Sequence, residues 1–183
     1  MSESFEIHEL DRFTVGAIGE PGSRLFLMQA NAGAEVITLK LEKQHVAAIA
    51  LELGEMLQTL PRPGHLPEDL DLIEPYDIAW AVSGLKAIWH EAADRVVLQA
   101  FEFEPDALTG IDPDSPDEVI EALENTTPSA TAKFSLTREQ AGALSIRCRL
   151  LVEAGRPPCP LCGYPLEPDH ACPRTNGNRP PNT

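Results

Sequence analysis

The stretch "EVITLKLEKQHVAAIALELGEMLQTL" (residues 35–60) decides how the first half of the chain folds. Its opening, EVITLKLE, alternates and is rich in β-branched residues, which is typical of a half-buried strand. From Lys43 onward the apolar residues recur every three or four positions, which predicts an amphipathic helix. Pro61 and Pro63 end this helix, because proline lacks the amide hydrogen that a helix interior needs. The sequence therefore predicts a strand that leads directly into a long helix.

Two more strands are expected upstream of this unit. Residues 13–19 and 24–30 alternate between apolar and polar, and Glu20-Pro21-Gly22-Ser23 separates them. A Pro-Gly pair suits the middle of a type II turn, so these strands form a hairpin. With the strand at residues 35–42 they predict a three-stranded antiparallel meander that precedes the helix.

The second half of the chain repeats this pattern. "AKFSLTREQAGAL" (residues 132–144) lines up with "ITLKLEKQHVAAI" (residues 37–49), and both predict a strand that runs into a helix. The second helix is expected to begin at the capping pair Thr137 and Gln140 and to stop at Gly155. A duplicated meander-plus-helix architecture accounts for the match, and two unrelated strand-helix units account for it equally well.

Alternation also predicts a long hairpin over residues 77–91 and 95–104, with its turn at residues 92–94. Residues 105–129 are acidic and predict a connector with a short helix that begins near Ser115. The expected fold class is α+β, with antiparallel β-meanders each followed by a long helix, plus a small C-terminal zinc-knuckle or ribbon-like motif. The expected domains are an α+β domain (1–154), a zinc-binding motif (155–175) and a flexible tail (176–183).

The sequence predicts a cytoplasmic protein with one main domain. A chain of 183 residues supports one main hydrophobic core. No run of about 18 to 20 apolar residues occurs, so no membrane span is predicted, and the acidic start MSESFEIHELDR does not resemble a signal peptide. The four cysteines are therefore expected to be reduced, which favours metal binding over disulfides.

The charge is strongly acidic. The chain has 14 Lys+Arg against 29 Asp+Glu, a formal net charge of −15. Proteins that bind nucleic acids neutralise phosphates with a basic face, so this balance argues against nucleic-acid binding. Solubility accounts for the charge, and a basic protein partner is the alternative interpretation.

The segment "RPPCPLCGYPLEPDHACPRTNG" (residues 156–177) predicts a metal site. Cys159, Cys162, His170 and Cys172 have the residue types and close spacing that tetrahedral Zn²⁺, or another thiophilic metal, takes as ligands. Four protein ligands leave no open position for a substrate or water, so the predicted site is structural. The zinc-deaminase signature is incomplete, because no histidine or cysteine is followed by glutamate at the second position.

No other catalytic motif stands out. Cys148 is expected to be a small buried hydrophobe, and Trp80 and Trp89 are expected in the core, with an exposed interface contact as the alternative. His45 and His65 have no evident partner in the sequence. Neither a G-x-S-x-G motif nor a phosphate-binding loop occurs.

Three quoted segments resemble one family: "DRFTVGAIGEPGSRLFLMQA", "LEKQHVAAIA" and "GRPPCPLCGYPLEPDHACPRTNG". They are similar to a bacterial family of uncharacterised proteins, DUF3090, over nearly the whole chain. The resemblance implies an α+β protein that ends in a small zinc-binding motif with the four ligands named above. It also implies a protein partner that is kinase-like or phosphatase-like, and it brings neither an activity nor catalytic residues.

The leading functional hypothesis is a cytoplasmic, zinc-binding, non-enzymatic binding or adaptor module. It rests on a full set of four metal ligands beside an absence of recognisable acid-base or nucleophilic groups. The rival hypothesis is an enzyme that acts on a phosphorylated or nucleotide-like metabolite. A deep polar pocket with His45, His65 or His90 among carboxylates favours the rival. A flat or apolar exposed patch near Trp80 or the zinc segment favours the binding module.

Overall fold

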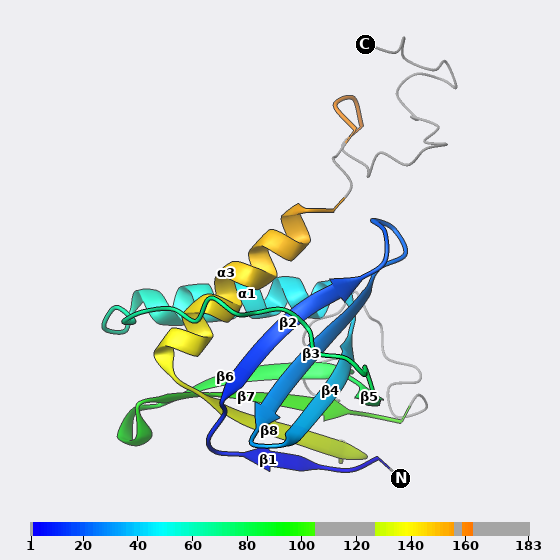
Figure 1. The fold of residues 1–183 in the computed structure, drawn as a ribbon. Coiled ribbons are helices and arrows are strands. Elements are labelled where there is room, and N and C mark those ends of the chain that lie inside the picture. Colours follow the sequence, from blue (N-terminus) through cyan, green and yellow to red (C-terminus); the bar gives the residue numbers. More distant parts are fainter. Residues whose placement is uncertain (1, 105–126, 156–158, 163–183) are drawn as a thin grey trace.

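The computed structural model describes residues 2–104, 127–155 and 159–162 (Figure 1). Within them the fold is α+β, with two four-stranded mixed sheets and two long helices. Sheet I has the strand order β2-β3-β4-β5, built from β2 (Arg12–Ile18), β3 (Leu25–Ala32), β4 (Glu35–Leu41) and β5 (Ile78–Ala81). Sheet II has the order β1-β8-β7-β6, built from β1 (Phe5–Ile7), β6 (Gly84–His90), β7 (Arg95–Glu102) and β8 (Ala130–Leu136). The helices are α1 (Lys43–Gln58) and α3 (Arg138–Glu153).

One hydrophobic core joins both sheets and both helices. The inward-facing residues of β2, β3, β4, β7 and β8 are buried in a single cluster. Phe13 of β2 and Phe134 of β8 bring their ring centres within 5.1 Å of each other across the space between the sheets. The helices pack on each other, and α3 also contacts β2 while α1 contacts β6. Each helix therefore follows one sheet and packs on the edge strand of the other, which interlocks the two halves.

The predicted first meander is confirmed as β2, β3 and β4, which pair antiparallel. The turn between β2 and β3 holds Gly22 at a φ of 102°, a conformation that glycine adopts without strain and that a type II turn requires. The predicted helix after β4 is also confirmed, and it ends at Gln58, just before Pro61 opens the next segment. Local patterning was therefore sufficient for this part of the fold.

The prediction of one long strand over residues 77–91 is wrong. The chain forms β5 in sheet I, crosses between the sheets at Val82 and Ser83, and continues as β6 in sheet II. The Val82 N–H donates to the Lys40 carbonyl at 2.8 Å, and the Ser83 N–H donates to the Phe101 carbonyl at 2.8 Å. Both pieces keep the strand period of two, so alternation alone cannot reveal that they join different sheets. The hairpin of β6 and β7, with its turn at residues 91–94, is confirmed.

The expectation of purely antiparallel pairing also needs correction. β5 pairs parallel with β4, and β1 pairs parallel with β8, so both sheets are mixed. The sequence analysis missed β1, because a strand of 3 residues is too short to show a periodicity. In chain order, β1 precedes the β2 meander but joins sheet II, and β5 precedes the β6 meander but joins sheet I. Each half therefore donates its first strand to the sheet of the other half.

The two meander-and-helix units match element by element. β2 and β6 have 7 residues each, β3 and β7 have 8, β4 and β8 have 7, and α1 and α3 have 16. The register matches as well: Phe26, the second residue of β3, pairs with Leu41, the last of β4, and Val96 of β7 pairs with Leu136 of β8 in the same places. Two unrelated units would not be expected to share both lengths and register. The structure therefore supports a repeated unit.

Several predicted segments lie outside the described residues. These are the acidic connector at 105–129 apart from its last three residues, the zinc motif at 155–175 apart from Gly155 and residues 159–162, and the tail at 176–183. The predicted domain boundaries stay predictions. No helix in the described ranges is long and apolar enough to cross a membrane.

Candidate functional site

The outer faces of the two sheets, which point away from the shared core, differ in what covers them. Residues 61–76, the covering segment, leave α1 and run across the outer face of sheet I (Figure 1). The fully buried Gln29 of β3 donates from Nε2 to the Ile73 carbonyl at 2.8 Å, and its Oε1 accepts from the Ile73 N–H at 2.8 Å. One side chain thus satisfies both backbone polar groups of an extended residue, as a neighbouring strand would.

Gln29 belongs to a row of three polar residues across sheet I. Thr14 pairs with Gln29, and Gln29 pairs with Thr38, so their side chains share the outer face. The Gln29 amide also donates to the Thr38 hydroxyl at 3.1 Å, and the Thr14 hydroxyl donates to the Leu70 carbonyl at 2.6 Å. All three residues are at most 1% exposed. Thr14 and Gln29 therefore bind the backbone of the covering segment, and Thr38 orients Gln29, in a dry setting where an unmade hydrogen bond is costly.

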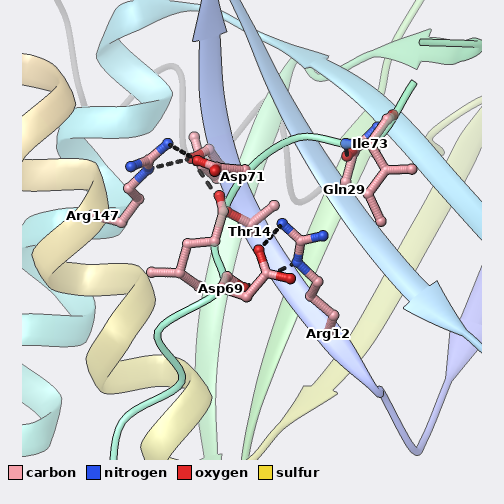
Figure 2. Close-up of polar contacts among 9 residues, drawn as sticks. Arg12, Thr14, Gln29, Asp69, Asp71, Ile73 and Arg147 are labelled. Carbon is pink, nitrogen blue, oxygen red and sulfur yellow. Dashed lines mark hydrogen bonds and ion pairs between the residues drawn. The ribbon is translucent and has the colours of Figure 1, made fainter. Parts of the chain in front are cut away.

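Ion pairs fix the covering segment at its flanks (Figure 2). Arg12 of β2 lies 3.1 Å from the Asp69 carboxylate and also donates to the Asp69 carbonyl at 3.1 Å. Arg147 of α3 lies 3.7 Å from the Asp71 carboxylate and donates to the Val15 carbonyl at 3.3 Å. The acidic side chains of the segment therefore meet cations from a strand and from a helix on either side of it.

A glycine lets the covering segment lie close to the sheet. A Cβ atom added at Gly16 would lie 2.5 Å from Cγ of Leu72, a distance that real contacts do not show. The Leu72 side chain therefore occupies the space that a side chain at position 16 would need. Gly16 is the fifth residue of β2, and the fifth residue of β6 is Ile88. The hollow that seats Leu72 on sheet I is thus filled on sheet II.

On sheet II the equivalent row is Lys86, Gln99 and Lys133. These are the third residue of β6, the fifth of β7 and the fourth of β8, which are the places that the sheet I row holds in β2, β3 and β4. Lys86 pairs with Gln99, and Gln99 pairs with Lys133. Lys86 is exposed and the other two are half-buried. In the part of the chain that the structure describes, the Gln99 side chain has no hydrogen-bond partner.

An open groove of about 560 Å³ lies on this outer face. Gln99 and Lys133 are among its lining residues. Its other charged and titratable lining residues are Arg95 and His90 beside the turn from β6 to β7, and Glu6, His8 and Glu9 in and after β1. His8 lies 3.8 Å from the Glu6 carboxylate. The groove therefore has a basic side over β6, β7 and β8 and an acidic side along β1.

The histidine that the sequence placed at the start of α1 has a structural role. His45 is the third residue of α1, and its Nδ1 accepts from the Glu42 N–H at 3.2 Å, so the neutral ring carries its proton on Nε2. Burial lowers the pKa of His45 below its ordinary value of 6.5, although a hydrogen bond with the Ser83 backbone and the Glu42 charge oppose this shift. His45 lies outside the groove on sheet II.

Gln140 is the third residue of α3, the position that His45 has in α1. Its Oε1 accepts from the Thr137 N–H at 3.0 Å, and the Thr137 hydroxyl accepts from the Gln140 N–H at 3.1 Å, which confirms the predicted capping pair. The Gln140 Nε2 donates to the Leu10 carbonyl at 2.8 Å. Leu10 and Ser83 lie in the two links where the chain crosses between sheets. The third residue of each helix therefore ties one crossing to one helix start.

The predicted metal ligands are only partly within the described residues. Cys159 is buried, and Cys162 is half-buried in the turn that follows it, while His170 and Cys172 lie outside the described ranges. The described ranges hold no group of three or more His, Cys, Asp or Glu side chains suited to a metal ion. The four-ligand site therefore stays a prediction.

The structure also places the cysteine and the two tryptophans that the sequence analysis expected in the core. Cys148 is fully buried, and burial raises the pKa of its thiol to about 12, which leaves it unreactive as expected. Trp80 is in the core, and its Nε1 donates to the Glu3 carbonyl at 2.9 Å. Trp89 packs against the core from β6. Sequence reasoning missed Gln29 and Gln99. A lone amide in an apolar strand, which needs a partner when it is buried, is the signal that could have found Gln29.

A family model described as "Protein of unknown function (DUF3090)" matches residues 5–172. Neither the curated proteins nor the solved structures contain a match.

Proposed function

The chain belongs to the DUF3090 family, and we propose that it is a non-enzymatic binding module of the cytoplasm whose partner surface is the outer face of sheet II. One observation carries this proposal. The two outer faces have the same backbone plan, but among the described residues only the face of sheet I is covered. The sheet II face displays Gln99, Lys133, Val97 and Ile88 along an open groove. Protein interfaces have about the same mix of apolar and polar groups as the rest of a protein surface, so the composition of this face suits a partner, and its open groove is what singles it out.

The proposal includes a structural Zn²⁺ bound by Cys159, Cys162, His170 and Cys172. Three thiolates and one imidazole form a donor set that suits tetrahedral zinc. Cys159 is only 5% exposed, which is compatible with a thiolate in a small closed site. Zinc in such a site orders a short segment that has little core of its own. Its part in binding would be to hold the C-terminal segment in one conformation.

Affinity capture from the host organism tests the partner surface. Val97→Glu places a bulky charge in the groove, and Leu51→Glu is the matched control, because Leu51 is 63% exposed on α1. A partner in stoichiometric amount is expected with the full chain and with Leu51→Glu, and it is expected to be lost with Val97→Glu. The family resemblance predicts a kinase-like or phosphatase-like protein as this partner. Capture of the same partner by Val97→Glu, or of none by the full chain, would contradict the proposal.

Metal analysis tests the zinc site separately. Cys159→Ser is expected to remove the zinc, about one ion per chain for four ligands, while the unfolding of the two sheets stays unchanged because the ligands are local in sequence. Cys148→Ala is the control, since Cys148 lies in the core and should leave the zinc content unaltered. Unchanged zinc in Cys159→Ser would refute the site.

A second candidate function is an enzyme that acts on a phosphorylated or nucleotide-like metabolite. The observation in its favour is that His8 and His90 line the same groove as two carboxylates and as Arg95 and Lys133, which suit an anionic group. Turnover of a phosphorylated metabolite by the full chain, lost in a folded His90→Asn variant, would support the enzyme. Retention of that turnover in His90→Asn would place the activity elsewhere.

A further inference from the structure

We infer that the outer face of sheet II binds an extended, acidic segment of a partner protein, with Gln99 holding its backbone and Lys86 and Lys133 holding its carboxylates. This inference rests on the proposed binding function and names the chemistry of the partner. It follows from the way sheet I binds its own covering segment.

The backbone contact has a precedent in the same molecule. On sheet I the amide of Gln29 receives and donates one hydrogen bond each with Ile73, at 2.8 Å in both cases. Gln99 occupies the same place in β7 that Gln29 occupies in β3, and the flanking strands have the same register. Its amide therefore points from the same place on an equivalent surface. A primary amide can satisfy both the N–H and the carbonyl of one extended residue, which fixes the position of the segment without regard to its sequence.

The charge preference comes from the two residues beside the glutamine. Thr14 and Thr38 flank Gln29, and Lys86 and Lys133 flank Gln99. Among the described residues, neither lysine has an ion-pair partner. An ammonium group donates up to three hydrogen bonds and accepts none, so its natural ligand is a carboxylate. The covering segment on sheet I is itself acidic, and its Asp69 and Asp71 meet arginines at the flanks of that sheet. On sheet II the two cations, Lys86 and Lys133, lie in the row itself, on either side of Gln99.

The remaining groups of the face set where the segment lies. Glu6 pairs with Lys133 in the β1–β8 register, and Glu9 lines the same end of the groove, so the β1 side repels an acidic chain. Arg95 and His90 lie at the other side, next to Ile88 and Val97. The segment is therefore expected over β6, β7 and β8. Since Ile88 fills the hollow that Gly16 leaves open on sheet I, the partner needs no large apolar side chain there.

The local chemistry of this face differs from that of the whole chain. The net charge of −15 favours a basic partner at long range. Screening by salt confines such long-range effects to about 8 Å at physiological ionic strength. Contacts at the face are therefore decided by Lys86, Lys133 and Gln99, and these suit an acidic segment.

A peptide-binding experiment on the full chain tests the inference. The probe is a fluorescent peptide with the sequence of residues 66–77, LPEDLDLIEPYD, because this acidic sequence is largely the one that lies extended on sheet I. Its own binding place on sheet I is occupied within each chain. The second peptide replaces every Asp by Asn and every Glu by Gln. Binding is followed by fluorescence anisotropy.

Two matched double variants locate the binding. Lys86→Glu with Lys133→Glu reverses both charges of the row, and Lys40→Glu with Lys43→Glu makes the same change in net charge in β4 and at the start of α1. The wild type is expected to bind the acidic peptide more tightly than the neutral one. The row variant should lose about tenfold in affinity, since two attractions become two repulsions, and the control should bind like the wild type. Gln99→Leu should weaken both peptides equally, because the amide binds backbone.

Equal affinity of the wild type for both peptides, or equal affinity of the two double variants for the acidic peptide, would overturn the inference. Affinity capture with the row variant separates a failure of this inference from a failure of the proposed function. If the row variant loses the captured partner but no acidic peptide binds, the binding face stands and the acidic ligand is wrong. If the row variant keeps the partner and the acidic peptide does not bind, both are wrong.

Discussion

The two repeated units share their lengths, their register and their order of elements, yet their outer faces have become different surfaces. The inward positions keep the same character: Ile49 and Leu144 are equivalent buried residues of the two helices, and so are Leu53 and Cys148. The outward positions do not, because Gly16 corresponds to Ile88 and Thr38 to Lys133. A shared core constrains volume and polarity on the inside, whereas the outer side of a sheet is constrained only by what covers it.

The third residues of the two helices show the same contrast, because they share a geometry and differ in chemistry. His45 and Gln140 are both third residues of a helix, and both tie their own helix start to a chain crossing. The geometry is common to both units, while the chemistry differs, because imidazole titrates near neutral pH and a carboxamide does not.

The largest effect is expected from the shared core. Leu39 and Phe134 are the fifth residues of β4 and β8, and both are fully buried. Leu39→Ala should lower the free energy of unfolding by about 2–5 kcal/mol and Phe134→Ala by about 3–5 kcal/mol. Urea unfolding followed by circular dichroism and by tryptophan fluorescence should give one coincident transition in each case, since both units contribute to one core. Separate transitions for the two units would show that they fold independently.

The two glutamines should differ clearly when truncated. Gln29→Ala leaves the Ile73 N–H and carbonyl without their buried partner, so it should cost about 1–3 kcal/mol of stability. Gln99→Ala removes no hydrogen bond to a described residue and should stay within about 0.5 kcal/mol of the wild type. Urea unfolding measures both, and hydrogen exchange at the Ile73 amide should rise only in Gln29→Ala. Equal costs for the two variants would mean that the sheet II face is covered as tightly as that of sheet I.

The stability of the whole fold should depend on pH through the third residue of α1, His45, and not through its counterpart in α3, Gln140. Burial lowers the pKa of His45 in the folded state, so the unfolded chain binds the proton more readily. The contribution of neutral His45 is therefore complete above its unfolded pKa of 6.5 and is lost as the pH falls below that value. His45→Gln copies the residue of α3 and should flatten the pH dependence of stability between about pH 7.5 and 5.5, a window in which carboxylates remain ionised. The same slope in both proteins would assign the effect to another group.

The smallest effect is expected at the rim of the covering segment. The Asp71 carboxylate lies 3.7 Å from Arg147, and its side chain is 92% exposed. Asp71→Asn should therefore change the free energy of unfolding by no more than about 0.5 kcal/mol. Urea unfolding checks this directly. A loss close to that of Gln29→Ala would show that charge, and not the buried backbone contact, holds the segment on sheet I.

Local patterning predicted the parts of the fold that depend on neighbours in the chain. The meander of β2, β3 and β4, both helices, the turn at Gly22 and the capping pair of Thr137 and Gln140 all follow from residues within a few positions of one another. The repeat was visible as a match of residues 37–49 with 132–144. The candidate binding face was not predicted, because Lys86, Gln99 and Lys133 come together only through strand pairing across the hairpin and the connector.

The sequence by itself determined the meander of β2, β3 and β4, the turn from β6 to β7, strand β8 and both helices, because periodicity and turn chemistry act over a few residues. Only the tertiary structure decided that the strands form two sheets, that β1 and β5 each join the sheet of the other half, and that residues 61–76 cover one outer face. Parallel pairing and burial of an outer face depend on contacts between residues far apart in the chain. The free energy of such pairing and burial depends on the surface that is contacted, and the local sequence pattern does not specify that surface.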